Sequence, residues 1–129
     1  MFETIKKLAG SFGVSGSEEE IREVIKSEIE GKVDEIKVDA LGNLIAVKKG
    51  SGKKIMVAAH MDEIGVMATY IDDKGYIRFS NIGWVWQYFA LGQRVMFKNG
   101  TVGAVFYEQK LKEMKDLKLS NMYIDIGAK

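Results

Sequence analysis

Residues 55–59 (IMVAA) are apolar at every position. A strand on a half-solvated sheet alternates apolar and polar side chains, whereas an uninterrupted apolar run is typical of a strand covered on both faces. We therefore expect these residues to form the central, buried strand of an α/β fold. Hydrophobic residues make up 47% of the chain, which gives its 129 residues enough apolar surface for a real core.

Two short helices are expected before this strand. Apolar residues recur at three- and four-residue steps over residues 2–12 and again over residues 21–29. Ser17 and Glu20 have the spacing of a capping box, which places the start of the second helix at Ser17. Gly31 follows the last periodic residue and is expected to end that helix.

Strands are expected over most of the remaining chain, because the apolar period there shortens to two. They cover residues 36–38, 44–47, 66–71, 76–79, 94–97, 101–106 and 122–126. Several short strands at this spacing predict a small barrel or sandwich in the second half. Leu111, Met114 and Leu117 predict one or two helical turns between the last two strands.

An aromatic cluster interrupts the second half. Residues 84–89 (WVWQYF) contain four aromatic side chains in six positions. They form either a loop folded onto the core or an exposed contact patch, since aromatic residues concentrate at the centres of protein interfaces.

Charge and residue usage exclude several function classes. The formal net charge of +1 gives no field that would hold nucleic acid or an anionic membrane. No apolar run approaches the roughly 18 residues of a membrane span, so we expect no membrane partner and a cytoplasmic protein. Cysteine is absent and histidine occurs once, so any histidine-dependent metal or catalytic site has to use His60.

The densest group of chemically active side chains lies in residues 58–65 (AAHMDEIG), directly after the expected central strand. Ligands bind at the carboxyl ends of strands in open α/β sheets. His60 could bind a metal ion there while Asp62 orients its imidazole. Alternatively, His60 only ends the strand and bonds to a neighbouring carboxylate. Glu63 is either an exposed surface carboxylate or a group that contacts the substrate.

Six segments together resemble the amino-terminal third of the M42 family of metallo-aminopeptidases. The family includes glutamyl and deblocking aminopeptidases, and some members were formerly labelled endoglucanases. The matching segments are residues 13–20 (GVSGSEEE), 38–46 (VDALGNLIA), 58–65 (AAHMDEIG), 71–75 (IDDKG), 91–95 (LGQRV) and 124–129 (IDIGAK). Residues 83–91 depart from the family pattern, which usually has a Gly-Gly-Trp-Asp stretch and a proline there.

The resemblance implies a fold and two catalytic-site positions. Residues 1–66 would be the first part of an α/β catalytic domain, and residues 67–129 the first part of an inserted β-barrel or PDZ-like domain for dimerisation and gating. His60 matches a ligand of one of two divalent metal ions, zinc or cobalt. Asp62 matches the aspartate that orients this histidine. In the family, the bridging aspartate, the glutamate base and the other ligands come from later sequence.

The resemblance also implies hydrolysis at the amino termini of peptide substrates by a homo-oligomer, either a dimer or a dodecamer. We expect the chain to supply only the opening portion of such an enzyme and to be inactive alone. An alternative is a non-catalytic assembly piece that pairs with itself or with a partner chain. A weaker alternative is a glycoside hydrolase, which needs two carboxylates about 5–9.5 Å apart.

Overall fold

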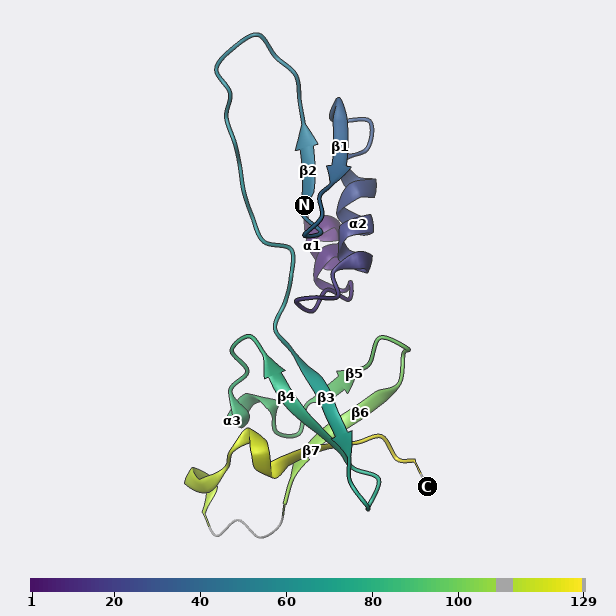
Figure 1. Cartoon of the computed structure of the whole chain (residues 1–129), viewed down its shortest axis with the longest axis vertical. Coiled ribbons are helices and arrows are strands. Elements are labelled where there is room, and N and C mark those ends of the chain that lie inside the picture. Colours follow the sequence, from purple (N-terminus) through teal and green to yellow (C-terminus); the bar gives the residue numbers. More distant parts are fainter. Residues whose placement is uncertain (109–112, 129) are drawn as a thin grey trace. The chain divides into compact units, whose positions relative to one another are not determined.

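The structure is a computed structural model that describes residues 1–108 and 113–128. The chain divides into two compact units, Met1–Glu63 and Ile64–Lys129, here called the first and second units (Figure 1). Helices and strands are mixed, as expected for an α/β chain. No helix in the described ranges is long and apolar enough to cross a membrane.

The first unit begins with the two predicted helices, α1 (Phe2–Ala9) and α2 (Glu19–Ile29). The predicted capping box is wrong. Glu18, not Ser17, occupies the position before α2, and it makes no side-chain capping bond to the described chain. The Glu20 carboxylate, which a capping box would direct to the backbone of Ser17, instead accepts a hydrogen bond from the backbone N–H of Phe12 in the preceding loop (3.1 Å).

A β-hairpin follows α2 and confirms the two predicted strands. β1 (Glu35–Val38) pairs antiparallel with β2 (Leu44–Val47). The Asp39 side chain closes the turn, because its Oδ1 accepts hydrogen bonds from the backbone N–H groups of Leu41 and Asn43, both at 2.9 Å. This Asx-type bonding adds to the backbone hydrogen bonds across the turn, from Asp39 N–H to Asn43 O (3.1 Å) and from Gly42 N–H to Asp39 O (3.0 Å).

The predicted central strand is not formed. Residues 53–62 are in neither a helix nor a strand of the described chain, and the side chains of residues 55–59 are exposed. They run as an extended loop after β2 (Figure 1). The segment has no strand neighbour in the described chain, where β1 and β2 pair only with each other, so nothing covers its apolar side chains.

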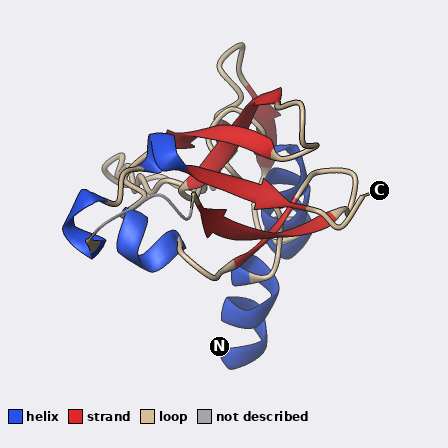
Figure 2. Ribbon diagram, turned by 90° about the horizontal axis from the view of Figure 1, so that it is seen from below, coloured by secondary structure: helices blue, strands red, loops and turns tan. Residues whose placement is uncertain are grey.

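The second unit is one antiparallel sheet (Figure 2), in the order β3-β4-β7-β6-β5. Its strands are β3 (Gly65–Ile71), β4 (Ile77–Ile82), β5 (Arg94–Met96), β6 (Val102–Tyr107) and β7 (Met122–Asp125). The five strands predicted here are confirmed; four agree within one residue at each end, and β4 runs three residues beyond the predicted end at Phe79. The sheet keeps β3 and β5 as edges and is not a closed barrel, because these two strands are not paired in the described chain.

Two short helical turns lie between β6 and β7, at Met114–Asp116 and Leu119–Asn121. They confirm part of the predicted helical segment, while Leu111 lies outside the described residues. A further short helix, α3 (Gln87–Ala90), follows the tryptophans and was not predicted.

The core of the second unit lies on one face of the sheet. Alternate residues of β4 and β7 point into it because successive side chains of a strand face opposite sides. The buried residues are Ile77, Phe79, Val105, Leu117, Met122 and Ile124. Gly103 lets β6 approach this core, since a Cβ atom at that position would collide with the Ile124 side chain.

Beside the core, Arg78 joins two carboxylates. Its Nη2 donates a hydrogen bond to Asp72 Oδ2 (2.8 Å), and its Nη1 lies 2.8 Å from Glu108 Oε1. The guanidinium also lies over the Tyr123 ring, 5.6 Å from its centroid. Arg78 thus ties the turn after β3 to the end of β6.

Replacing Asp72 with asparagine is expected to destabilise the second unit at neutral pH and to matter less in acid. Partial burial opposes ionisation of Asp72, but hydrogen bonds from Arg78 and from backbone N–H groups outweigh it and lower the pKa. A lowered pKa adds stability above the unfolded value of about 4, and this stability is lost as pH falls through the folded pKa.

Thermal unfolding of the wild type and of Asp72→Asn at about pH 7 and about pH 3 measures this linkage. The difference in Tm between the two proteins should be smaller at the lower pH. Asp73→Asn changes the adjacent, exposed carboxylate and should leave Tm nearly unchanged at both values. An Asp72→Asn difference that is as large in acid as at neutral pH would contradict the prediction.

Candidate metal-binding site

Two loops of the first unit meet beside His60. Val14 and Glu63 form a parallel β-bridge. The backbone N–H of Glu63 donates to the carbonyl of Gly13 (2.8 Å), and the N–H of Ser15 donates to the carbonyl of Glu63 (3.3 Å). The loop between α1 and α2 is thereby fixed against the segment that follows the apolar run.

Gly13 is required at this meeting point. An ideal Cβ atom there would lie 2.7 Å from the Ile21 Cγ2 atom. The absence of a side chain therefore lets the loop pack directly against α2, which in turn places Ser15 opposite Asp62.

The structure brings His60 and Asp62 into contact. The Nδ1 atom of His60 lies 3.0 Å from the backbone oxygen of Asp62 and 3.1 Å from its Oδ1 atom. Two oxygen acceptors at Nδ1 assign the proton of a neutral imidazole to that nitrogen, and in this tautomer Nε2 carries the lone pair. The His60 side chain is 86% exposed, so Nε2 is accessible.

The Asp62 carboxylate is held from its other side as well. The Ser15 hydroxyl donates a 2.5 Å hydrogen bond to its Oδ2 atom. This bond, helped by His60 and opposed by partial burial, lowers the pKa of Asp62. Asp62 is therefore an ionised acceptor with one oxygen directed to Ser15 and the other to His60.

Sequence reasoning did not find Ser15. It lies 47 residues from Asp62, and no periodicity or spacing links the two positions. The only signal was its place in the Gly13-to-Gly16 turn, within one of the segments that resemble the M42 family.

These residues fit one corner of a metal site. A metal-binding histidine is usually a neutral imidazole whose second nitrogen donates a hydrogen bond to a carboxylate. A divalent ion needs several ligands, however, and no group of three His, Cys, Asp or Glu residues in the described chain could hold one. Glu63 takes part through its backbone, and its side chain is exposed.

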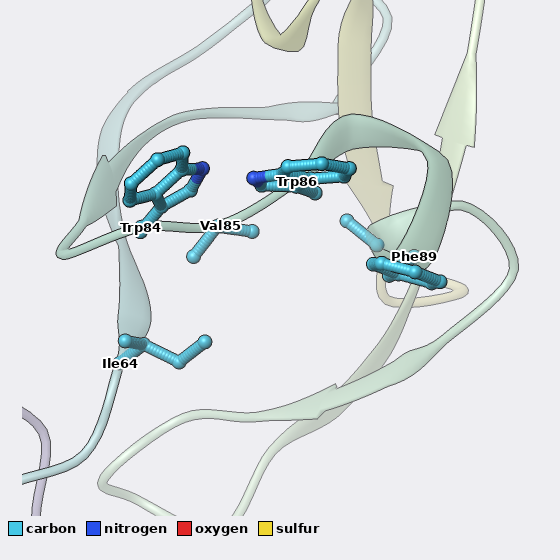
Figure 3. Close-up of a pocket in the computed structure, with 6 residues that line it drawn as sticks. Ile64, Trp84, Val85, Trp86 and Phe89 are labelled. Atoms are coloured by element: carbon cyan, nitrogen blue, oxygen red, sulfur yellow. The ribbon is translucent and has the colours of Figure 1, made fainter.

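A separate apolar cavity of about 420 Å³ lies in the second unit. The residues around it are Ile64, Trp84, Val85, Trp86, Phe89 and Ala90, here called the aromatic face (Figure 3). The rings of Trp86 and Phe89 stack with centroids 6.0 Å apart. Trp84 and Phe89 are mostly exposed, so the cluster forms a surface patch and is not folded onto the core.

Comparison with known proteins gives matches along the whole chain. Residues 42–129 match the family model described as M42 glutamyl aminopeptidase. A putative aminopeptidase of Acetivibrio thermocellus is 71% identical over 129 residues, which are 100% of this chain and 39% of that protein.

Solved structures agree with this match. The TET1 peptidase of Pyrococcus horikoshii, described as assembling into a tetrahedron or a large octahedral shell, has a TM-score of 0.83 and 36% identity, over 98% of this chain and 40% of its own. An endoglucanase of Thermotoga maritima has a TM-score of 0.83 and 40% identity, over 95% and 38%. The chain spans about two fifths of the length of these proteins.

Proposed function

Because the chain belongs to the M42 family of glutamyl aminopeptidases, we propose that it supplies the opening portion of an enzyme that removes residues from the amino termini of peptides. The arrangement of His60, Asp62 and Ser15 is the observation that carries the proposal. It gives an accessible imidazole nitrogen a fixed orientation. We also propose a cytoplasmic location, as the resemblance to the M42 family implies.

His60 would bind one of two divalent ions through Nε2, and zinc and cobalt both suit an imidazole ligand. Asp62 would act as a positioning residue that keeps the Nδ1 proton in place, and Ser15 would hold Asp62. When bound, divalent ions polarise the scissile carbonyl and activate water for attack. The remaining ligands would come from the three fifths of the relatives that this chain does not match, so the chain alone would be inactive.

We propose that residues 1–66 open the catalytic domain and that residues 67–129 open the inserted domain for dimerisation and gating. The change from one compact unit to the next after Glu63 supports this division. The antiparallel sheet of the second unit supports a β-rich inserted domain.

The test of this function uses the complete enzyme, meaning the longer protein of which this chain would be the opening portion. Its hydrolysis of aminoacyl chromogenic substrates is measured with zinc or cobalt added. Metal-dependent release of the chromophore is expected, and a chelator should remove it. Cello-oligosaccharides are tested as alternative substrates of the same enzyme, because the related Thermotoga maritima protein is described as an endoglucanase. Hydrolysis of these sugars without peptide hydrolysis would overturn the proposal.

Asp62→Asn in the complete enzyme is expected to lower metal affinity or activity about 10–100-fold, the usual cost of losing the carboxylate behind a metal-binding histidine. Titration with zinc or cobalt separates this role from a structural one, because the metal concentration for half-maximal activity should rise. Asp73→Asn removes an exposed carboxylate of the second unit and should leave the titration unchanged. An unaltered metal requirement in Asp62→Asn would exclude the positioning role.

We also propose homo-oligomer formation through the aromatic face. Its support is the exposure of Trp84 and Phe89 and the assembly described for the TET1 relative. The same contact would serve a non-catalytic assembly piece, so it does not depend on peptide hydrolysis.

Trp84→Ala combined with Phe89→Ala is expected to weaken self-association at least about 30-fold, since the loss of even one buried aromatic anchor costs about 2 kcal/mol. Sedimentation equilibrium measures the dissociation constant. Ile71→Ala removes an exposed apolar side chain elsewhere in the same unit and should have little effect. An unchanged dissociation constant in the double variant would place the interface elsewhere.

A further inference from the structure

The turn that carries Ser15 has a fixed backbone. The N–H of Ser17 donates a hydrogen bond to the carbonyl of Val14 (2.7 Å), which closes a β-turn. Gly16, the third residue of this turn, has a φ angle of +86°, as a type II turn requires. The parallel bridge between Val14 and Glu63 ties the start of the turn to the segment that follows the apolar run. The backbone of Ser15 is therefore held on both sides.

The Ser15 hydroxyl restrains the Asp62 carboxylate at the oxygen that His60 does not contact. Oδ2 of Asp62 accepts the hydrogen bond from Ser15, and Oδ1 lies 3.1 Å from Nδ1 of His60. The Asp62 side chain is 37% exposed, so packing alone does not fix its torsion angles. Without the Ser15 hydroxyl, the carboxylate could turn toward solvent and leave Nδ1.

The proton at Nδ1 decides which nitrogen of His60 can bind a metal ion. A neutral imidazole carries one proton, and only the other nitrogen has the lone pair that a metal ion needs. In water, a neutral histidine side chain favours the proton on Nε2, which leaves the lone pair on Nδ1. In the structure, Nδ1 instead faces Oδ1 and the backbone oxygen of Asp62, both of which are acceptors. The fold thus stabilises the tautomer that is less common in water.

We infer that Ser15 is a positioning residue, which acts through Asp62 to keep the proton of His60 on Nδ1 and so makes Nε2 the metal-binding nitrogen. The inference deepens the proposed function and rests on it for the role of His60 as a ligand. The hydroxyl acts as a hydrogen-bond donor, so a residue that keeps the hydroxyl should replace Ser15. The loop between α1 and α2 thereby belongs to the metal site, although Ser15 is not itself a ligand in this assignment.

Long-range proton–nitrogen NMR correlation of the imidazole tests the inference. His60 is the only histidine of the chain, so the spectrum reports this ring alone. The measurement distinguishes the two neutral tautomers at about pH 8.5, where imidazole is neutral. The wild-type chain should hold the proton on Nδ1. Ser15→Ala should lower the ratio of the Nδ1–H to the Nε2–H tautomer at least about threefold, a fraction of what a hydrogen bond to a charged group contributes.

Two further substitutions separate the Ser15 hydroxyl from the loop that carries it. Ser15→Thr keeps the hydroxyl and should keep the wild-type tautomer ratio. Ser11→Ala removes the hydroxyl of another serine of the same loop, which donates to the carbonyl of Lys7 (2.8 Å), and should leave the ratio unchanged. The amide signals of Val14 and Glu63 show whether the bridge between them persists, as the inference requires in Ser15→Ala.

Metal binding by the complete enzyme gives a second measurement. In equilibrium dialysis, Ser15→Ala should raise the dissociation constant for zinc or cobalt, by less than the roughly 10–100-fold expected for Asp62→Asn. Ser15→Thr should bind the metal as the wild type does.

Five results would overturn the inference. They are a wild-type proton on Nε2, an unchanged tautomer ratio in Ser15→Ala, a ratio in Ser15→Thr as low as in Ser15→Ala, loss of the Val14–Glu63 bridge in Ser15→Ala, and unchanged metal affinity of Ser15→Ala. Loss of the bridge would make Ser15 a structural residue of the loop. The NMR measurements use neither metal nor peptide, so an inactive enzyme whose tautomer depends on Ser15 would count against the aminopeptidase proposal alone.

Discussion

His60→Ala in the complete enzyme is expected to abolish metal-dependent peptide hydrolysis. Alanine has no lone pair to replace Nε2, so the loss should exceed the roughly 10–100-fold expected when only the orienting carboxylate is changed. The aminoacyl substrate assay with zinc or cobalt measures this. Activity at the wild-type level would show that His60 is not a ligand.

Such a loss would not be caused by misfolding, because the His60 side chain is 86% exposed in this chain and contributes little packing. The circular dichroism spectrum and Tm of His60→Ala should match those of the wild type. Direct metal binding provides the decisive comparison. The variant should bind fewer metal ions, or bind them more weakly, in equilibrium dialysis, and unchanged stoichiometry and affinity would contradict the assignment.

Ile124→Ala is expected to destabilise the second unit by about 2–5 kcal/mol, the cost of emptying a fully buried aliphatic site. Ile124 has no exposed surface and lies at the centre of the core, where β7 pairs with both β4 and β6. Gly103 packs directly against it, so at that position the neighbouring strand has no side chain that could fill the space.

Urea unfolding followed by tryptophan fluorescence measures this effect in the second unit alone, because Trp84 and Trp86 are the two tryptophans of the chain. The unfolding midpoint should fall while the slope stays constant. Ile71→Ala removes the same atoms from a mostly exposed position and should change stability by no more than about 0.5 kcal/mol. Equal effects of the two substitutions would contradict the assigned core.

The sequence predicted the strands well where their partners lie in the same unit. The β1–β2 hairpin and the strands of the second unit all pair within their own unit, so local alternation and turn residues carried enough information. Residues 55–59 show the opposite case. Their apolar pattern predicts a strand buried on both faces. No other part of the described chain covers these residues, so they are exposed.

The candidate site could be predicted only in part. His60 and Asp62 are two residues apart, and this spacing alone made their contact a reasonable expectation. Ser15 reaches Asp62 only because the Val14–Glu63 bridge brings distant loops together. The start of α2 was misplaced for a similar reason, since the Glu20 carboxylate bonds to Phe12 in the preceding loop.

The position of β7 has a consequence for how the protein is made. β7 is the last of the described strands along the chain, yet it lies between β4 and β6. During synthesis, the hairpins β3–β4 and β5–β6 therefore emerge from the ribosome before the strand that joins them. The sheet of the second unit cannot form until residues 122–125 have been synthesised. Until then, the two hairpins have unpaired strand edges, which can aggregate or bind chaperones.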